Sequence, residues 1–130
     1  MTPLEILDTY KIFAVVGLSN RPSRPSYSVA AFLKEHGYRI VPVNPLIAEV
    51  HGEKCFPDLP SIPFRIEVVD IFRRSELVLP VVQDAIRVGA KAVWMQLGVI
   101  NEEAAQLARD AGLEVVMDRC PVIEMRRAGR

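Results

Sequence analysis

The sequence has little of what marks several classes of protein. Its formal net charge is zero, so overall charge gives no reason to expect a nucleic acid or a membrane as partner. No apolar run approaches the roughly 20 residues that a membrane-spanning helix needs, and the N-terminus lacks a basic region followed by a long apolar segment. We therefore expect a protein that is neither exported nor embedded in a membrane.

Cysteine and histidine are scarce. The two cysteines, Cys55 and Cys120, lie far apart and form no Cys-x-x-Cys pair, and no histidine completes a metal-binding motif with them. Neither a zinc site nor a disulfide framework is predicted, and we expect a reduced, cytoplasmic setting.

Signals for catalysis are also weak. His36 and His51 are isolated, and no Ser–His–Asp or Cys–His arrangement can be read from their positions, so no catalytic residue is predicted. Cys120 precedes a predicted helix, where a thiolate would be stabilised, although a buried, inert cysteine is the favoured interpretation. Asp70 and Asp118 end predicted strands, but sequence does not give the separation that paired acid–base work needs.

What the sequence does contain is typical of one folded domain. The chain has 130 residues, of which 50% are hydrophobic and 25% charged, enough to bury a core. It has no internal repeat and no low-complexity segment. We therefore expect residues 1–130 to form a single domain.

Short apolar runs along the chain predict five strands. Residues 12–16, "IFAVV", form an unbroken apolar run, as expected for a parallel strand covered on both faces. In the second strand, Pro42 predicts either a short strand or pairing that stops there. Residues 46–64 are rich in proline and are expected to have little regular structure. The predicted strands are residues 12–16, 38–45, 66–72, 91–98 and 113–118.

Helical periodicity appears between these strands. The first predicted helix spans residues 25–36 and ends before Gly37. A second is capped by Ser75, with Pro80 in its first turn, and a third is capped by Asn101. These two helices are closed by Gly89 and Gly112, and a short last helix begins at Pro121.

Strands that alternate with helices predict the α/β class. Right-handed crossovers put the helices on both faces of a parallel sheet, so we expect a doubly wound, Rossmann-like domain with five parallel strands. The expected strand order, numbered along the chain, is 3-2-1-4-5. In such sheets ligands bind beyond the carboxyl ends of the strands, near the point where strand order reverses.

The most informative stretch follows the first strand and reads GLSNRPSRPS, residues 17–26. It contains two arginines and enters the amino end of a helix, where free N–H groups and partial positive charge favour a phosphate. No acidic residue occurs between Gly17 and Lys34. The helix after the fourth strand instead begins with Glu102 and Glu103, which would repel a phosphate. The first helix is therefore the better anion site.

This loop matches the dinucleotide-binding fingerprint Gly-x-Gly-x-x-Gly only in part. Gly17 fits the first position, but Ser19 and Pro22 stand where the second and third glycines belong. A tight turn with solvated arginines therefore stays an alternative to a phosphate site. The second strand also lacks the terminal Asp or Glu that binds ribose hydroxyls in NAD sites, and it ends with Val43, Asn44 and Pro45. Asn44 suits a ligand hydrogen bond or, as the favoured alternative, a turn before proline.

The next two strands are followed by further candidates. An aromatic ring beside a guanidinium plane suits stacking on a base and pairing with a phosphate, while a core aromatic and a solvated basic turn are an equal alternative. That pattern after the third strand is Phe72, Arg73 and Arg74. Glycine after the fourth strand permits close ligand approach or a simple turn, and the residues there are Gln96, Leu97 and Gly98.

Six segments together resemble a known family. They are "VVGLSNRPSRPSY", "GYRIVPVNP", "VDIFRRSE", "AVWMQLG", "NEEAAQLARDAGL" and "VVMDRCP". In order and spacing they resemble the small stand-alone CoA-binding proteins, which look like the CoA-binding Rossmann-type domain of the succinyl-CoA synthetase alpha subunit. The resemblance covers almost the whole chain, so it is more specific than any single motif.

The resemblance implies coenzyme A, or an acyl-CoA, as ligand, with its phosphates on the loop after the first strand. In that loop the matching positions are Gly17, Ser19, Asn20, Arg24, Pro25 and Ser26. Three further ligand-facing segments are implied, namely Val43, Asn44 and Pro45, then Ile71, Phe72 and Arg73, then Gln96, Leu97 and Gly98.

The residues themselves favour CoA over NAD. CoA carries a 3′-phosphorylated ADP, so its site needs local positive charge and no carboxylate for free ribose hydroxyls. Arg21, Arg24, Arg73 and Arg74 supply the charge, and Asn44 stands where the carboxylate would be.

Binding is the part of the synthetase's activity that we expect to carry over. The 130 residues hold no counterpart of its domain with a phosphorylated histidine, so thioester formation would need a partner. Two other functions stay open, an NADP-dependent oxidoreductase or redox sensor and a regulatory protein acting with a synthetase-like partner. Self-association into a homo-oligomer is also left open.

Overall fold

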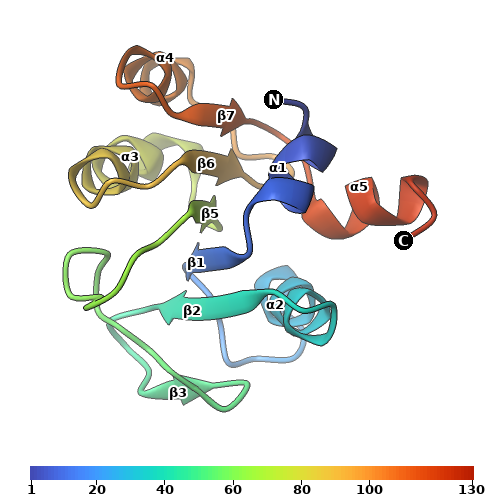
Figure 1. Ribbon diagram of the computed structural model, residues 1–130. Coiled ribbons are helices and arrows are strands. Elements are labelled where there is room, and N and C mark those ends of the chain that lie inside the picture. The colour runs from blue at the N-terminus through green and yellow to red at the C-terminus, as the bar shows by residue number, and fades with distance from the viewer.

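Five parallel strands form the centre of the structure, a computed structural model that describes residues 1–130 (Figure 1). The strands are β1 (Ile12–Val16), β2 (Arg39–Val43), β5 (Val68–Ile71), β6 (Ala92–Met95) and β7 (Glu114–Val116). All adjacent pairs are parallel, so the carboxyl ends of the strands meet at one edge of the sheet. The predicted α/β class with a five-stranded parallel sheet is confirmed.

The order of the strands across the sheet is β2-β1-β5-β6-β7. The expected order put the third strand, β5, outside β2, and this detail was wrong because β5 lies between β1 and β6. All four residues of β5 are buried, as a central position demands. Strand β2 contains Pro42, whose missing N–H is tolerated at a sheet edge. Strand order therefore reverses between β1 and β5, where a ligand crevice is expected.

Pairing of β2 continues past Pro42, which the sequence had suggested as its end. Pro42 lies opposite Val15 of β1, and Val43 lies opposite Val16. The Pro42 carbonyl accepts a hydrogen bond from the Phe56 N–H at 2.9 Å, on the side away from β1. Because the amide nitrogen and the carbonyl of one strand residue point to the same side, the missing N–H costs no bond to β1.

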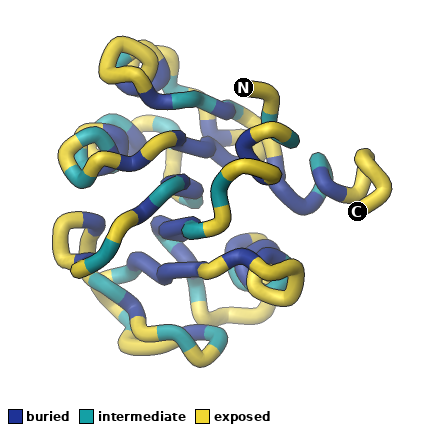
Figure 2. The backbone as a smooth tube through the Cα atoms, viewed as in Figure 1, coloured by how far each residue is buried: buried dark blue, intermediate teal, exposed yellow.

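Helices cover both faces of the sheet (Figure 1). On one face lie α1 (Pro3–Thr9), α2 (Pro25–Glu35) and α5 (Pro121–Arg127), and on the other lie α3 (Val78–Arg87) and α4 (Glu102–Asp110). Alternate residues of each strand pack into two apolar cores, one on each face of the sheet. Figure 2 shows the buried strands between exposed helix surfaces. None of the helices has both the length and the apolar character needed to cross a bilayer.

Most of the predicted helix ends are confirmed. The Asn101 side chain accepts a hydrogen bond from the Ala104 N–H at 2.9 Å and caps α4. Gly89 and Gly112 follow α3 and α4 with positive φ angles, as helix terminators do. Ser75 does not cap α3 as expected. It begins a short 3-10 helix (Ser75–Leu77), and its hydroxyl accepts a hydrogen bond from the Ile100 N–H at 3.0 Å.

Two features were not predicted from the sequence. Helix α1 begins with a capping box, in which the Thr2 hydroxyl accepts from the Glu5 N–H at 3.2 Å and the Glu5 carboxylate accepts from the Thr2 N–H at 2.8 Å. The connection after β2 contains a small hairpin of β3 (Glu49–Val50) and β4 (Glu53–Lys54).

Candidate functional site

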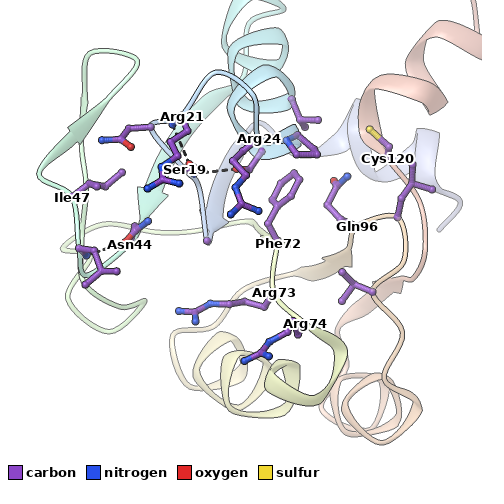
Figure 3. A pocket seen from close by; sticks show the side chains of 18 residues that line it. Ser19, Arg21, Arg24, Asn44, Ile47, Phe72, Arg73, Arg74, Gln96 and Cys120 are labelled. Carbon is purple, nitrogen blue, oxygen red and sulfur yellow. Dashed lines mark hydrogen bonds between the residues drawn. The ribbon is translucent and has the colours of Figure 1, made fainter.

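A cavity of about 830 Å³ opens beyond the carboxyl ends of β1, β2, β5 and β6 (Figure 3). It lies where strand order reverses, which is the position that the fold favours for a ligand. Of the fifteen residues predicted to contact the ligand, eleven line it, namely Gly17, Ser19, Asn20, Arg24, Pro25, Ser26, Asn44, Phe72, Arg73, Gln96 and Leu97.

The other four predicted residues do not line this cavity. Val43 and Ile71 are buried in the core on the α3–α4 face. Pro45 is exposed beside Asn44, and the Gly98 N–H donates to the Asp118 carboxylate at 2.7 Å. All four lie at or just after the carboxyl ends of β2, β5 and β6, next to residues that do line the cavity.

Seven further residues line the cavity. Three of them, Arg21, Arg74 and Cys120, are discussed above on their sequence pattern but are not among the fifteen predicted ligand contacts. The remaining four are Val29, Leu46, Ile47 and Val99. Val29 lies on α2 just after the loop, and Leu46, Ile47 and Val99 lie in the connections that follow β2 and β6. Apolar residues at these positions carry no local signal that separates a cavity lining from the core.

Gly17 turns the chain out of β1 with a φ of +85°. A Cβ atom at this position would lie 2.2 Å from the carbonyl oxygen of Phe72, far inside any van der Waals contact. Glycine is therefore required at this first position of the partial fingerprint for a steric reason, because β1 and β5 end side by side.

Two serines fold the loop between β1 and α2. The buried Ser26 hydroxyl accepts a hydrogen bond from the Ser19 N–H at 3.0 Å, and the Ser19 hydroxyl accepts from the Arg21 N–H at 3.0 Å. The backbone N–H groups of Asn20, Ser23 and Ser26 donate to no protein acceptor. Helix α2 also has no side-chain cap. The loop therefore presents free donors of the kind that bind an anion.

The charge around the cavity has one sign. Four arginines line it, and no carboxylate does. Arg74 lies 3.7 Å from the Glu76 carboxylate, but both side chains are exposed, so that pair neutralises little. The other three arginines, Arg21, Arg24 and Arg73, form no ion pair. A ligand with several negative charges would meet uncompensated cations here.

Asn44 ties two loops of the site together. Its side-chain N–H donates to the Leu18 carbonyl at 3.1 Å, and its side-chain oxygen accepts from the Leu46 N–H at 2.9 Å. The favoured prediction of a turn at this asparagine is thus confirmed. A carboxylate could not donate to the Leu18 carbonyl, which explains in structural terms why the acidic residue typical of NAD sites does not suit this position.

One end of the cavity is less charged. In Figure 3, Phe72 lies between Arg24 and Gln96, with Cys120 on the Gln96 side. Gln96 is 5% exposed, and its side-chain oxygen is buried without a hydrogen-bond partner. Cys120 is buried, as the sequence had suggested, but it borders the cavity rather than the core alone.

Asp70 lies inside β5, below the cavity rather than in its lining. Its carboxylate is fully buried, and neither oxygen has a hydrogen-bond partner. Burial raises the pKa of Asp70 well above the ordinary value of an aspartate, because the charged form loses its hydration. Asp70 therefore favours the neutral carboxylic acid.

Neither histidine lines this cavity. His36 shares a hydrogen bond of 2.8 Å with the Phe32 carbonyl, and His51 shares one of 2.8 Å with the Tyr27 carbonyl. Both therefore pack against backbone carbonyls away from the cavity. Asp118 accepts from a backbone N–H and has no carboxylate partner at the site.

Residues 11–126 match the family described as CoA binding domain. The chain is 43% identical over 116 residues to the protein YneT of Bacillus subtilis, with 89% of this chain and 86% of that protein covered. It is 27% identical over 95 residues to acetate–CoA ligase (ADP-forming) II of Archaeoglobus fulgidus, covering 72% of this chain but only 14% of the ligase. The matched part is thus a small segment of the ligase.

A solved structure shares the same architecture. A protein of Pyrococcus horikoshii OT3 superposes with a TM-score of 0.93 at 44% sequence identity, covering 98% of this chain and 92% of that one. The resemblance to small stand-alone CoA-binding proteins is confirmed. This chain belongs to the CoA binding domain family.

Proposed function

We propose that this protein binds coenzyme A or an acyl-CoA in the cavity beyond β1, β2, β5 and β6. The ligand phosphates lie on the loop of residues 17–26 and at the amino end of α2. One observation carries the proposal above the others. Four arginines and the free N–H groups of this loop converge on a cavity whose lining contains no carboxylate.

The chemistry of the ligand fits the two ends of the cavity. The 3′-phosphorylated ADP of CoA carries most of its charge, which suits the arginine-rich end. Its pantetheine arm is neutral and carries two amides, which suits the end where Phe72 and the unpaired oxygen of Gln96 lie. A bound arm would extend from the charged end past Phe72 toward Gln96.

Isothermal titration calorimetry at moderate salt tests this proposal. We expect CoA and acetyl-CoA to bind, and dephospho-CoA, which lacks the 3′-phosphate, to bind more weakly. Circular dichroism on the same sample establishes that the protein is folded. A folded protein that gives no binding of CoA or acetyl-CoA would overturn the proposal, and binding of NADP without CoA would support the oxidoreductase alternative.

A second function, as a subunit that presents CoA to a larger enzyme, is favoured by one observation. The chain is similar to a segment of an acetate–CoA ligase (ADP-forming) that makes up 14% of that protein. A protein partner with the remaining ligase segments would then supply the chemistry. Affinity copurification of such a partner with the tagged protein tests this idea. If the protein binds CoA but no such partner copurifies, the binding function is supported and the subunit function is not.

A further inference from the structure

The two cysteines are equally buried but differ in their surroundings. Cys55 is 8% exposed and Cys120 is 7% exposed. Cys120 lines the candidate site and also a neighbouring cavity of about 590 Å³ between α2 and α5, whereas Cys55 lines neither. Its thiol is thus sheltered from bulk water and open to a molecule in the site.

The turn that carries Cys120 is fixed to the end of β6. The Trp94 indole N–H donates to the Arg119 carbonyl at 2.9 Å, and the Arg119 N–H donates to the Met95 carbonyl at 3.3 Å. The Asp118 carboxylate accepts the Gly98 N–H at 2.7 Å. Three bonds therefore hold residues 118–119 against the strand end that carries Gln96, so Cys120 keeps its place at the cavity.

Gln96 gives an independent sign that a ligand reaches this end. Its side-chain oxygen is buried and accepts no hydrogen bond from the protein. An unpaired buried acceptor costs free energy that a ligand N–H would recover. The pantetheine arm of CoA offers amide N–H donors and ends in a thiol, so a ligand bonded to Gln96 would bring its sulfur to the Cys120 side of the cavity.

We propose that Cys120 is a site of reversible covalent capture, at which the protein forms a mixed disulfide with the pantetheine thiol of its ligand. This inference rests on the proposed function. The oxidant is the symmetric disulfide of that thiol. The deprotonated Cys120 sulfur attacks one ligand sulfur, the ligand S–S bond breaks, and a new S–S bond joins Cys120 to one half. The other half leaves as a thiolate and takes up a proton.

Capture of this kind makes retention of the ligand dependent on redox state. Under oxidising conditions the ligand stays bonded whatever its noncovalent affinity, and a reducing thiol reverses the exchange and frees it. The loop arginines give the reaction its selectivity, because they favour a disulfide that carries phosphates over one of similar reactivity without them.

Intact-protein mass spectrometry of the full chain tests the inference. The protein is incubated with CoA disulfide, and we expect one CoA adduct that dithiothreitol removes. Peptide mapping should locate the adduct on Cys120. Cys120→Ser should abolish it, while Cys55→Ser, which changes an equally buried cysteine outside the site, should leave it unchanged.

A comparison of two disulfides tests selectivity. Cystamine is a small disulfide without phosphates, so Arg24→Ala should slow the adduct with CoA disulfide about tenfold, the effect of one lost charge-assisted bond, and leave the cystamine reaction unchanged. If Arg24→Ala slowed adduct formation equally with CoA disulfide and with cystamine, the arginine-lined site would have no role in selectivity. An adduct that maps to Cys55, or none in a protein that binds CoA, would overturn the inference.

Calorimetry separates this inference from the proposed function. If the parent protein binds CoA but forms no adduct, covalent capture is ruled out and the proposed binding function is supported. If the folded protein neither binds CoA nor forms an adduct, both proposals are wrong. Peptide mapping of the parent protein decides the position of the adduct even if Cys120→Ser does not fold.

Discussion

A Cβ atom on Gly17 would lie 2.2 Å from the carbonyl oxygen of Phe72. The two residues meet because β1 and β5 are neighbours and the Phe72 N–H donates to the Val16 carbonyl at 2.9 Å. Gly17 also has a φ of +85°, which side chains with a Cβ rarely adopt. Gly17 is thus required for the ends of β1 and β5 to pack together, whether or not a ligand is bound.

We expect Gly17→Ala to lower the free energy of unfolding by about 2–4 kcal/mol, because backbone strain and steric overlap act together. Gly112→Ala is the matched control. Gly112 has the same φ of +85° but no atom within 4 Å of an added Cβ, so its cost should be strain alone, about 1–2 kcal/mol. Urea unfolding measures both variants, and equal losses would show that the Phe72 contact relaxes without cost.

Arg24 lines the cavity, is exposed and forms no ion pair. Arg24→Ala should weaken CoA binding by about 1–3 kcal/mol, the scale of a lost charge-assisted hydrogen bond. Calorimetry at two salt concentrations measures the effect, and the affinity of the parent protein should fall with added salt.

Arg109→Ala is the control for Arg24→Ala, since it removes the same charge from an exposed position on α4 outside the cavity. It should bind CoA like the parent protein. If the two variants bind CoA equally well, Arg24 makes no phosphate contact and the loop holds the ligand through its backbone alone.

The sequence was sufficient to predict the fold class but not the order of the strands. Alternating apolar runs and helical segments report on each element by itself, while neighbours in a sheet are chosen by packing between distant segments. Two local signs pointed to the right order. Strand β5 is apolar except for Asp70, which suits a central place, and Pro42 suits an edge.

The site was predictable where its residues are consecutive in the chain. The loop of residues 17–26 carries its own signal in serines, arginines and the absence of acids, and most of it lines the cavity. Ile47 and Cys120 were missed, because they reach the cavity through the turn at Asn44 and through bonds to the end of β6. Such contacts have no counterpart in local composition.

Ser26 supports the loop from below. Its buried hydroxyl accepts the Ser19 N–H at 3.0 Å, so Ser26→Ala would leave that N–H without its partner. We expect a loss of about 1 kcal/mol in the free energy of unfolding and weaker CoA binding, because the loop is no longer held in one shape. Ser28→Ala, on the same helix, removes an exposed hydroxyl and should change neither quantity by much. A Ser26 variant with unaltered CoA affinity would mean that the ligand itself orders the loop.

Asp70 gives a prediction for pH. Burial raises its pKa in the folded protein, so the folded state holds the proton more tightly than the unfolded state does. Between the unfolded pKa, about 3.9, and the raised folded value, the folded protein binds more protons. Its free energy of unfolding therefore falls as pH rises through this window. The stabilising contribution of the neutral acid is fully present only below the unfolded pKa.

Asp70→Asn isolates this effect, since an amide of nearly the same shape does not ionise. The pKa values of Glu5 and Asp8 are lowered by hydrogen bonds to Thr2 and Arg130, so these two groups give a pH dependence of opposite sign. The parent protein and Asp70→Asn share that dependence, and it cancels in the difference between their free energies of unfolding. We expect the stability of Asp70→Asn relative to the parent protein to rise from pH 4 to pH 7 in urea unfolding. Parallel pH curves would mean that Asp70 reaches water or a hydrogen-bond donor in solution, and that its proton is not held by burial.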